Sequence, residues 1–137
     1  MDNSCLFCRF ASKELPVDIL YEDDHVIVFP DIAPIAPVHL LVVPKIHIAS
    51  VAQAADHQGA ILGHLFLGAR KAAAEKGLLG YKTVVNVEAQ GGQEIMHVHM
   101  HVLGGTALTM PLPSTNAGKN PKGPSVRSIS VQRAAMI

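Results

Sequence analysis

Three histidines alternate with apolar residues toward the end of the chain, at His97, His99 and His101. Side chains repeat every two residues along a β-strand, so these imidazoles would project from one face at intervals of about 6.6–6.8 Å. Aligned imidazoles can ligate a metal, act as nucleophiles or hydrogen-bond a phosphate. A solvent-exposed polar face is the alternative, but threonine, lysine or glutamate would serve there equally well. The spacing therefore favours a functional site.

A glycine pair and a glutamine, Gly91, Gly92 and Gln93, come shortly before the histidines. Paired glycines let the backbone approach a ligand closely and can point N–H groups at an anion. A glycine pair before a strand is usually only a turn, so this motif gains its weight from its position. Together, the amides and the imidazoles predict a bound phosphate.

The chain has two cysteines, Cys5 and Cys8, in the C-x-x-C spacing. This spacing lets both sulfur atoms face one ion, as in many zinc sites, and the missing ligands would be histidines distant in sequence. Spacing alone does not choose them. A redox dithiol is the alternative, although it normally accompanies a βαβ pattern that is not evident here. Two cysteines are too few for the disulfide framework of a small secreted domain.

The composition predicts one globular domain. The chain has 137 residues, 49% of them hydrophobic, and a formal net charge of zero. This balance argues against a nucleic-acid coat and against binding to anionic membranes. No apolar run reaches the ~18 residues of a membrane-spanning helix, and no signal-peptide pattern is present, so we expect a cytoplasmic protein. Residues 111–137 hold four basic residues and no acidic ones, which predicts a basic tail.

Hydrophobic periodicity predicts the elements that must position these groups. Apolar residues at helical spacing predict one long helix over residues 56–76, with Asp56 as its N-cap and Gly77 just beyond its end. A short helix is expected over residues 2–11. Apolar runs predict strands over residues 17–21, 26–29, 39–43, 81–87 and 98–103.

These elements predict an α+β domain built on an antiparallel sheet. The apolar stripe of the long helix should lie on that sheet. Val98, Met100 and Val102 alternate with the histidines, so they would face the helix while the imidazoles point away from it. Prolines make residues 30–37 a stiff loop.

The histidine pattern resembles the signature of the histidine-triad (HIT) superfamily, in which histidines alternate with apolar residues. The following pair, Gly104 and Gly105, resembles the nucleoside phosphoramidase (Hint) branch more than the dinucleoside-polyphosphate (Fhit) branch. The resemblance covers roughly residues 4–110, and it predicts a HIT domain over residues 1–110 with a tail over residues 111–137. Matching segments include residues 31–34 and 36–39, which resemble the ribose loop and upstream histidine, and residues 44–48 and 80–86.

The resemblance implies a five-stranded antiparallel sheet with one long helix and a short N-terminal helix. It also implies that His99 attacks the α-phosphorus and forms a nucleotidyl-histidine intermediate that water hydrolyses. His101 and the Gln93 side chain would hold the phosphate oxygens, and His97 would complete the catalytic row. Asp31 would bind the ribose hydroxyls. The other implied nucleotide contacts are Phe7, Phe29 and Ile32 around the base, Asn86 near the ribose or leaving oxygen, and Gly92; Phe10 fits the base pocket and an ordinary core equally well.

Two further residues extend the implied catalytic set. Glu94 stands where eukaryotic Hint proteins have a serine associated with protonation of the leaving group. A carboxyl group could give or take that proton if the site raised its pKa, and a solvated charge at a strand start is the alternative. His39 would be a partner of the nucleophile, because the tautomer of an imidazole is set by what its other nitrogen meets.

The resemblance also supplies the missing metal ligands. Many HIT proteins with this C-x-x-C bind zinc through both cysteines, the histidine of the Pro-Lys-x-His segment and the first triad histidine. In this chain these residues are Cys5, Cys8, His47 and His97. Four protein ligands leave no open position, so the zinc would be structural. The resemblance further implies a homodimer whose sheets join edge to edge, with residues 81–87 and the long helix in contact.

The sequence thus predicts a hydrolase that binds AMP- or GMP-like purine nucleotides and cleaves the P–N bond of adenosine phosphoramidates through His99. One alternative is a dinucleoside-polyphosphate hydrolase or nucleotidyl transferase that uses the same histidine, which the glycine pair disfavours. Another is a nucleotide-sensing scaffold without enzymatic activity, whose partner reads the basic tail. The expected partners are a nucleotide and a second copy of the chain, with no nucleic acid and no membrane.

Overall fold

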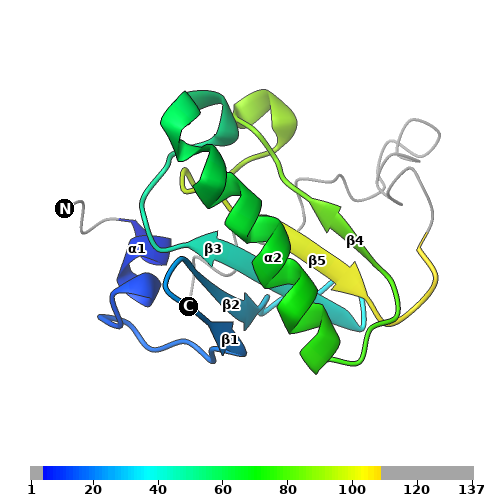
Figure 1. Ribbon diagram of the computed structural model, residues 1–137. Coiled ribbons are helices and arrows are strands. Elements are labelled where there is room, and N and C mark those ends of the chain that lie inside the picture. The colour runs from blue at the N-terminus through cyan, green and yellow to red at the C-terminus, as the bar shows by residue number, and fades with distance from the viewer. Residues whose placement is uncertain (1–4, 109–137) are drawn as a thin grey trace.

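Short apolar runs form five strands of one antiparallel sheet in the computed structural model, which describes residues 5–108 (Figure 1). Their order across the sheet is β1-β2-β3-β5-β4. The expected α+β class and five-stranded antiparallel sheet are confirmed. The tail over residues 111–137 lies outside the described residues. The strands are β1 (Tyr21–Glu22), β2 (Val26–Pro30), β3 (Val38–Pro44), β4 (Tyr81–Val84) and β5 (Met100–Gly104).

Two α-helices accompany the sheet, α1 (Leu6–Ala11) and α2 (Gly59–Glu75). The expected helix start at Asp56 was wrong by one turn, because Asp56–Gln58 forms a 3-10 turn before α2. The Gln58 side chain accepts from the Ala55 N–H at 2.8 Å, so glutamine rather than Asp56 stabilises this turn. Gly77 follows α2 with a φ of 70°, as its expected place beyond the helix end requires. Two further 3-10 turns are Val51–Gln53 and Ala89–Gly91.

The long helix α2 crosses one face of the sheet. The short helix α1 lies at the edge of the molecule, beside β3 (Figure 1). Val98, Met100 and Val102 pack in the core cluster that contains Leu65 and Ala69 of α2, which confirms their expected direction. A second core cluster lies around α1 and includes Phe7, Phe10, Phe29, Leu41 and Val43.

Prolines on neighbouring strands determine two strand starts that the sequence pattern placed too early. The first strand was expected from residue 17 but begins at Tyr21, because Tyr21 pairs with Val28 and the register would bring residue 19 opposite Pro30. The last strand was expected from residue 98 but begins at Met100, because Val42 pairs with Met100 and residue 98 would face Pro44. Proline lacks the N–H that a ladder needs.

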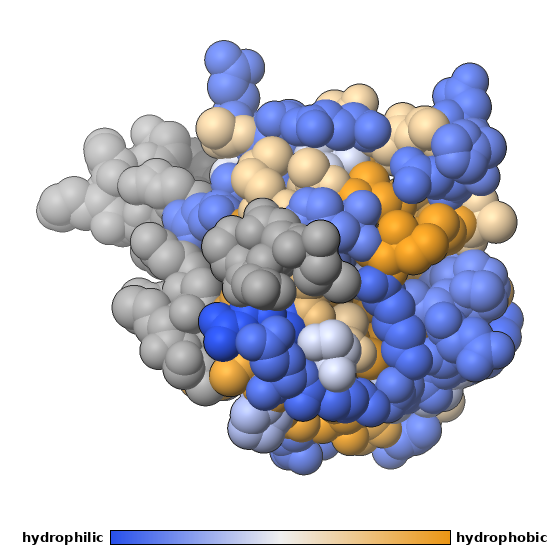
Figure 2. Space-filling view, turned by 90° about the vertical axis from the view of Figure 1, so that its left-hand side faces the viewer, coloured by the Kyte–Doolittle hydropathy of each residue, from blue (hydrophilic) through white to orange (hydrophobic). Residues whose placement is uncertain are grey.

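Strand β4 is an edge strand and is shorter than the expected 81–87, ending at Val84 opposite His101. Apolar residues remain exposed on β4 and α2, including Tyr81 and Phe66. On the side of the molecule that carries α1, apolar patches are interspersed with hydrophilic residues (Figure 2). Within residues 5–108, no helix has the length and apolar character needed to cross a membrane.

Candidate active site and metal cluster

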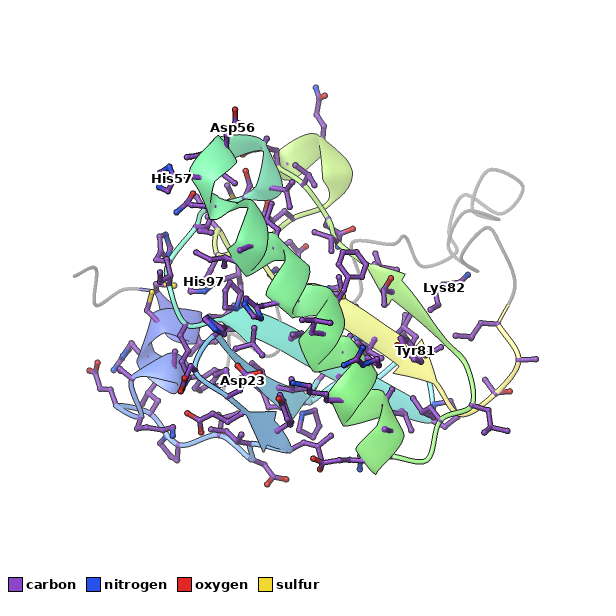
Figure 3. All side chains as sticks on the ribbon, in the orientation of Figure 1. Asp23, Asp56, His57, Tyr81, Lys82 and His97 are labelled. Atoms are coloured by element: carbon purple, nitrogen blue, oxygen red, sulfur yellow. The ribbon has the colours of Figure 1, made fainter. Side chains whose placement is uncertain are left out.

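The three histidines of the row are buried, each with at most 2% of its surface exposed. They were expected along one strand, but β5 begins at Met100, so His97 and His99 lie before it. The ring of Phe7 in α1 packs edge-on against His97 and His99, with centroids 5.9 and 5.2 Å apart. Figure 3 shows His97 beside the start of α1, where the cysteine sulfur atoms lie. The row therefore divides between two groups of partners.

His97 belongs to a group that we call the cysteine cluster. Its Nδ1 lies 3.3 Å from Cys5 Sγ, 3.5 Å from Cys8 Sγ and 3.1 Å from His47 Nδ1. Cys8 Sγ lies 3.3 Å from His47 Nδ1. Two sulfur and two nitrogen atoms thus converge from α1, from the loop after β3 and from the segment before β5. The cysteine cluster consists of Cys5, Cys8, His47 and His97, the four residues that the sequence resemblance implied.

The donor set and spacing of the cysteine cluster fit a tetrahedral metal ion. Bonds of ~2.0–2.3 Å to Zn²⁺ place neighbouring ligand atoms roughly 3.3–3.8 Å apart. The Nε2 of His97 lies 2.9 Å from the carbonyl oxygen of Pro44, which can only accept, so Nε2 carries the proton. The Nδ1 lone pair of His97 therefore points at the sulfur atoms, as ligation requires.

A hydrogen bond to His97 fixes the tautomer of His99. Its Nδ1–H donates to the His97 carbonyl oxygen at 2.7 Å, so its Nε2 carries the lone pair. That Nε2 is buried and has no hydrogen-bond partner within residues 5–108. Burial lowers the pKa of His99 to about 4, and likewise that of His97, so both rings are neutral at pH 7.

His101 belongs to a second buried group, the imidazole relay. The Nδ1 of His39 accepts from the Ile35 N–H at 3.2 Å, so the proton of His39 lies on Nε2. This Nε2–H donates to His101 Nδ1 at 3.0 Å. Asp31 Oδ2 lies 3.4 Å from the same His39 Nε2. His101 Nε2 then carries a proton and has no partner among the described residues. The imidazole relay consists of Asp31, His39 and His101.

Burial keeps the two imidazoles of the relay neutral. It lowers the pKa of His101 well below the ordinary value, with the neighbouring His99 and His39 adding to the effect. It also lowers the pKa of His39, against the opposing effect of Asp31. The ring of His99, with a bare Nε2, and the ring of His101, with a protonated Nε2, have their centroids 5.2 Å apart. This arrangement can offer one oxyanion-bearing group both a nucleophile and a hydrogen-bond donor.

A cavity of about 320 Å³ adjoins the relay at Asp31. The apolar residues expected around a base differ in where they lie. Phe7, Phe10 and Phe29 are buried and pack on one another, with centroids 5.3–6.3 Å apart, whereas Ile32 is 53% exposed and lines the cavity. Phe10 is thus part of the core around α1. The cavity is lined by Pro16, Val17, Asp18, Pro30, Asp31 and Ile32.

The N–H groups of the glycine loop, residues 88–93, donate to carbonyl oxygens within the same loop. The N–H groups of Gly91 and Gln93 donate to the Glu88 carbonyl oxygen, and that of Gly92 donates to the Ala89 oxygen. The Gln93 side chain donates to the oxygens of Ala49 and Ile95 and accepts from the Glu88 N–H. These donors, which the sequence suggested for a phosphate, therefore hold the loop in shape, and phosphate contacts at Gly92 and Gln93 stay a prediction.

Asn86 and Glu94 flank the glycine loop. Asn86 is half-buried between β4 and the loop, and Glu94 is exposed directly after Gln93. The roles expected for them stay predictions.

One residue of this loop escaped the sequence analysis. Glu88 has a φ of 62°, which is uncommon for a residue other than glycine. Its carboxylate accepts from the Ser50 hydroxyl and, at 2.9 Å, from the Gln53 side chain. These hydrogen bonds, that from Ser50 first, lower the pKa of Glu88. Glu88 thus ties the loop to the segment after His47, and no local sequence signal marks it.

Comparison with known proteins finds matches over most of the chain. The family model for the HIT domain matches residues 12–108. An uncharacterised HIT-like protein of Synechococcus elongatus is 46% identical over 112 residues, covering 81% of this chain and 98% of that protein. A HIT family hydrolase from Legionella pneumophila superposes with a TM-score of 0.74 at 43% identity, covering 78% and 97% of the two chains. A histidine triad protein from Clostridium difficile superposes with a TM-score of 0.76 at 40% identity, covering 80% and 96%.

Proposed function

This chain belongs to the HIT family, and from that premise we propose that it hydrolyses purine nucleoside phosphoramidates, as the Hint-like branch does. It would bind an AMP- or GMP-like nucleotide and cleave the bond between phosphorus and nitrogen. A HIT family hydrolase is among the solved structures that the chain resembles.

The observation that carries this proposal is the state of His99. Its Nε2 is a buried lone pair without a partner among the described residues, and the bond from its Nδ1–H to His97 fixes that tautomer. A neutral imidazole is a good nucleophile toward phosphorus and a good leaving group afterwards. The protonated Nε2 of His101 would donate to a phosphate oxygen beside it.

The proposed reaction has two steps. First, His99 Nε2 bonds to the phosphorus while the P–N bond breaks, and the amine leaves with a proton supplied by Glu94 or by water. Water then attacks the phosphorus, the bond to Nε2 breaks, one proton of the water returns to Glu94 or to the solvent, and the nucleoside monophosphate leaves. The neutral ring is restored, so the chain is unchanged after one cycle.

The remaining nucleotide contacts follow from position. Asp31 is the member of the relay that lines the cavity, so its carboxylate would accept from the ribose hydroxyls. Ile32 would cover the base, with Phe7 and Phe29 forming the packed layer behind it. Asn86 and the glycine loop that contains Gly92 and Gln93 would border the phosphate and the leaving group.

We assign a structural Zn²⁺ to the cysteine cluster. All four ligands come from the chain, which leaves no coordination position for substrate. Bound there, the ion would neutralise thiolate charge and tie α1 and the loop after β3 to the segment that presents His99. Cys5 and Cys8 would bind it as thiolates, and His47 and His97 through Nδ1.

A homodimer is part of the same proposal. β4 is an edge strand of the sheet, with Tyr81 40% exposed, and α2 leaves Phe66 59% exposed. Pairing two β4 edges would cover these residues. Sedimentation of the full chain should therefore give a dimer, whereas a monomer at micromolar concentration would contradict this part of the proposal.

The test is hydrolysis of a fluorogenic adenosine phosphoramidate by the wild type, by His99→Ala and by His57→Ala, which removes an exposed histidine outside the site. We expect loss of at least about a thousandfold in kcat for His99→Ala, since a nucleophile has no substitute, and none for His57→Ala. No hydrolysis by the wild type would overturn the proposal. Faster cleavage of a dinucleoside tetraphosphate would favour the dinucleoside-polyphosphate hydrolase instead.

A further inference from the structure

The cavity beside Asp31 has a second carboxylate that no role assigned so far explains. Asp18 lines the cavity together with Asp31, while the other lining residues are proline, valine and isoleucine. Asp18 is exposed, and within residues 5–108 it makes no hydrogen bond or ion pair. An apolar slot with hydrogen-bond acceptors is the arrangement that fixes the orientation of a small ligand.

The relay indicates how a nucleotide would be oriented in this cavity. His101 presents its protonated Nε2 where a phosphate would lie, and its Nδ1 leads through His39 to Asp31 over contacts of 3.0 and 3.4 Å. A nucleotide with its phosphate at His101 and its ribose at Asp31 extends its base into the cavity. This step rests on the proposed function. The edge of the base farthest from the ribose would then face the other residues that line the cavity, Asp18 among them.

A carboxylate can only accept hydrogen bonds, so it distinguishes bases by their donors. The far edge of guanine offers two adjacent donors, N1–H and the 2-amino group, which match the two oxygens of a carboxylate. Adenine offers one donor beside the lone pair of N1, which a carboxylate repels. Hypoxanthine retains N1–H and lacks the 2-amino group. Uracil offers a single donor, N3–H, between two carbonyl acceptors, and cytosine offers its 4-amino group beside the lone pair of N3.

We propose that Asp18 reads the nucleobase and gives this chain a preference for guanine nucleotides. The apolar walls supply affinity for any purine ring, and Asp18 discriminates among them. Because Asp18 is exposed, water competes for its oxygens, so discrimination of about tenfold is expected rather than the larger ratios of a fully buried pair.

The experiment measures dissociation constants of GMP, IMP and AMP by calorimetry at fixed salt concentration. The variants are the full-length wild type, Asp18→Asn and the control Asp24→Asn, which removes an exposed carboxylate that does not line the cavity. For the wild type we expect GMP to bind most tightly, IMP more weakly and AMP about tenfold more weakly than GMP. Asparagine offers a donor and an acceptor, which suit the edge of adenine, so Asp18→Asn should abolish or reverse the ratio.

Two results would overturn the inference while leaving the proposed function standing. One is equal affinity of the wild type for GMP and AMP. The other is a guanine preference that survives in Asp18→Asn. Failure of all three nucleotides to bind would instead contradict the proposed function, and the inference with it. An unchanged preference in Asp24→Asn is required, because a loss there would mean that net charge rather than Asp18 sets the ratio.

Discussion

The cysteine cluster and the imidazole relay lie on either side of His99 and have similar spacing, yet they suit different chemistry. In the relay, one proton order pairs a donor with an acceptor in both hydrogen bonds, from the Ile35 N–H to His39 and from His39 to His101. In the cysteine cluster, the proton of His97 is already used by Pro44, so its lone pair faces two sulfur atoms and another imidazole. A bound cation would offset the repulsion among these electron-rich atoms, whereas the relay is held by hydrogen bonds.

The difference teaches that the second ring nitrogen decides the role of each histidine. His97 donates through Nε2 and so presents Nδ1 to the cluster. His99 donates through Nδ1 and so presents a bare Nε2. His101 accepts at Nδ1 and so presents a protonated Nε2. Residues of one type at one spacing thus present a bare Nδ1, a bare Nε2 and a protonated Nε2.

Removing the metal from the cysteine cluster should have the largest effect on stability. A metal present at a thousand times its Kd adds about 4 kcal/mol to the free energy of unfolding. For a domain of this size, that corresponds to a fall in Tm of roughly 12–20 °C on chelation. Cys8→Ser should start from the lower Tm and show no response to the chelator. The measurements are calorimetry and metal analysis of freshly purified protein, and absence of metal from the wild type would refute the assignment.

Removal of the proposed metal should also change the tautomer of His99, the proposed nucleophile, while sparing the relay. His97 is the link, because it contributes Nδ1 to the cluster and its carbonyl oxygen to His99. We expect the ¹⁵N spectrum of His99 to change from one tautomer to a mixture on chelation, at a temperature where the circular dichroism is unchanged. The spectrum of His101 is the internal control. An unaltered His99 tautomer in protein shown to be free of metal would mean that the two regions are independent.

The sequence predicted the elements better than their ends, for a physical reason. Periodicity places α2 and the strands because core contacts along one element are local in sequence. The starts of β1 and β5 depend on Pro30 and Pro44, which lie on the partner strands. Register is needed before a proline on one strand can be seen to end the ladder of another.

The same limit applies to the site. The sequence resemblance brought together all the residues of the cysteine cluster, because ligand identity is a matter of residue type. Tautomers could not be predicted, since they depend on the Pro44 oxygen and the Ile35 N–H, which are backbone groups of distant segments. Glu88 was missed because it adopts a positive φ at a position where a glycine would normally signal such a turn.

The relay should make stability depend on pH in a way that one substitution isolates. Burial holds the pKa of His101 below its unfolded value of 6.5, so the unfolded chain takes up a proton first as the pH falls. Stability from this group is therefore complete above pH 6.5 and decreases below it, by up to about 1.4 kcal/mol per pH unit. Urea unfolding between pH 7.5 and 5 should show a shallower decrease in His101→Gln than in the wild type. The cysteine cluster is the same in both proteins, and His57→Gln is the control. Parallel curves for His101→Gln and the wild type would contradict the buried neutral ring.

The smallest effect should come from Glu88, where two opposing contributions can be separated. Its side chain bonds Ser50 and Gln53, which stabilises the glycine loop, while its φ of 62° strains the backbone. Glu88→Ala loses the bonds and keeps the strain, whereas Glu88→Gly loses the bonds and relieves the strain. Glu88→Gln keeps an oxygen that can accept both bonds. We therefore expect Tm to fall by a few degrees in Glu88→Ala, less in Glu88→Gly, and least in Glu88→Gln. Equal Tm values for the alanine and glycine variants would show that the backbone there carries no strain, and that the loop is held by its side-chain bonds alone.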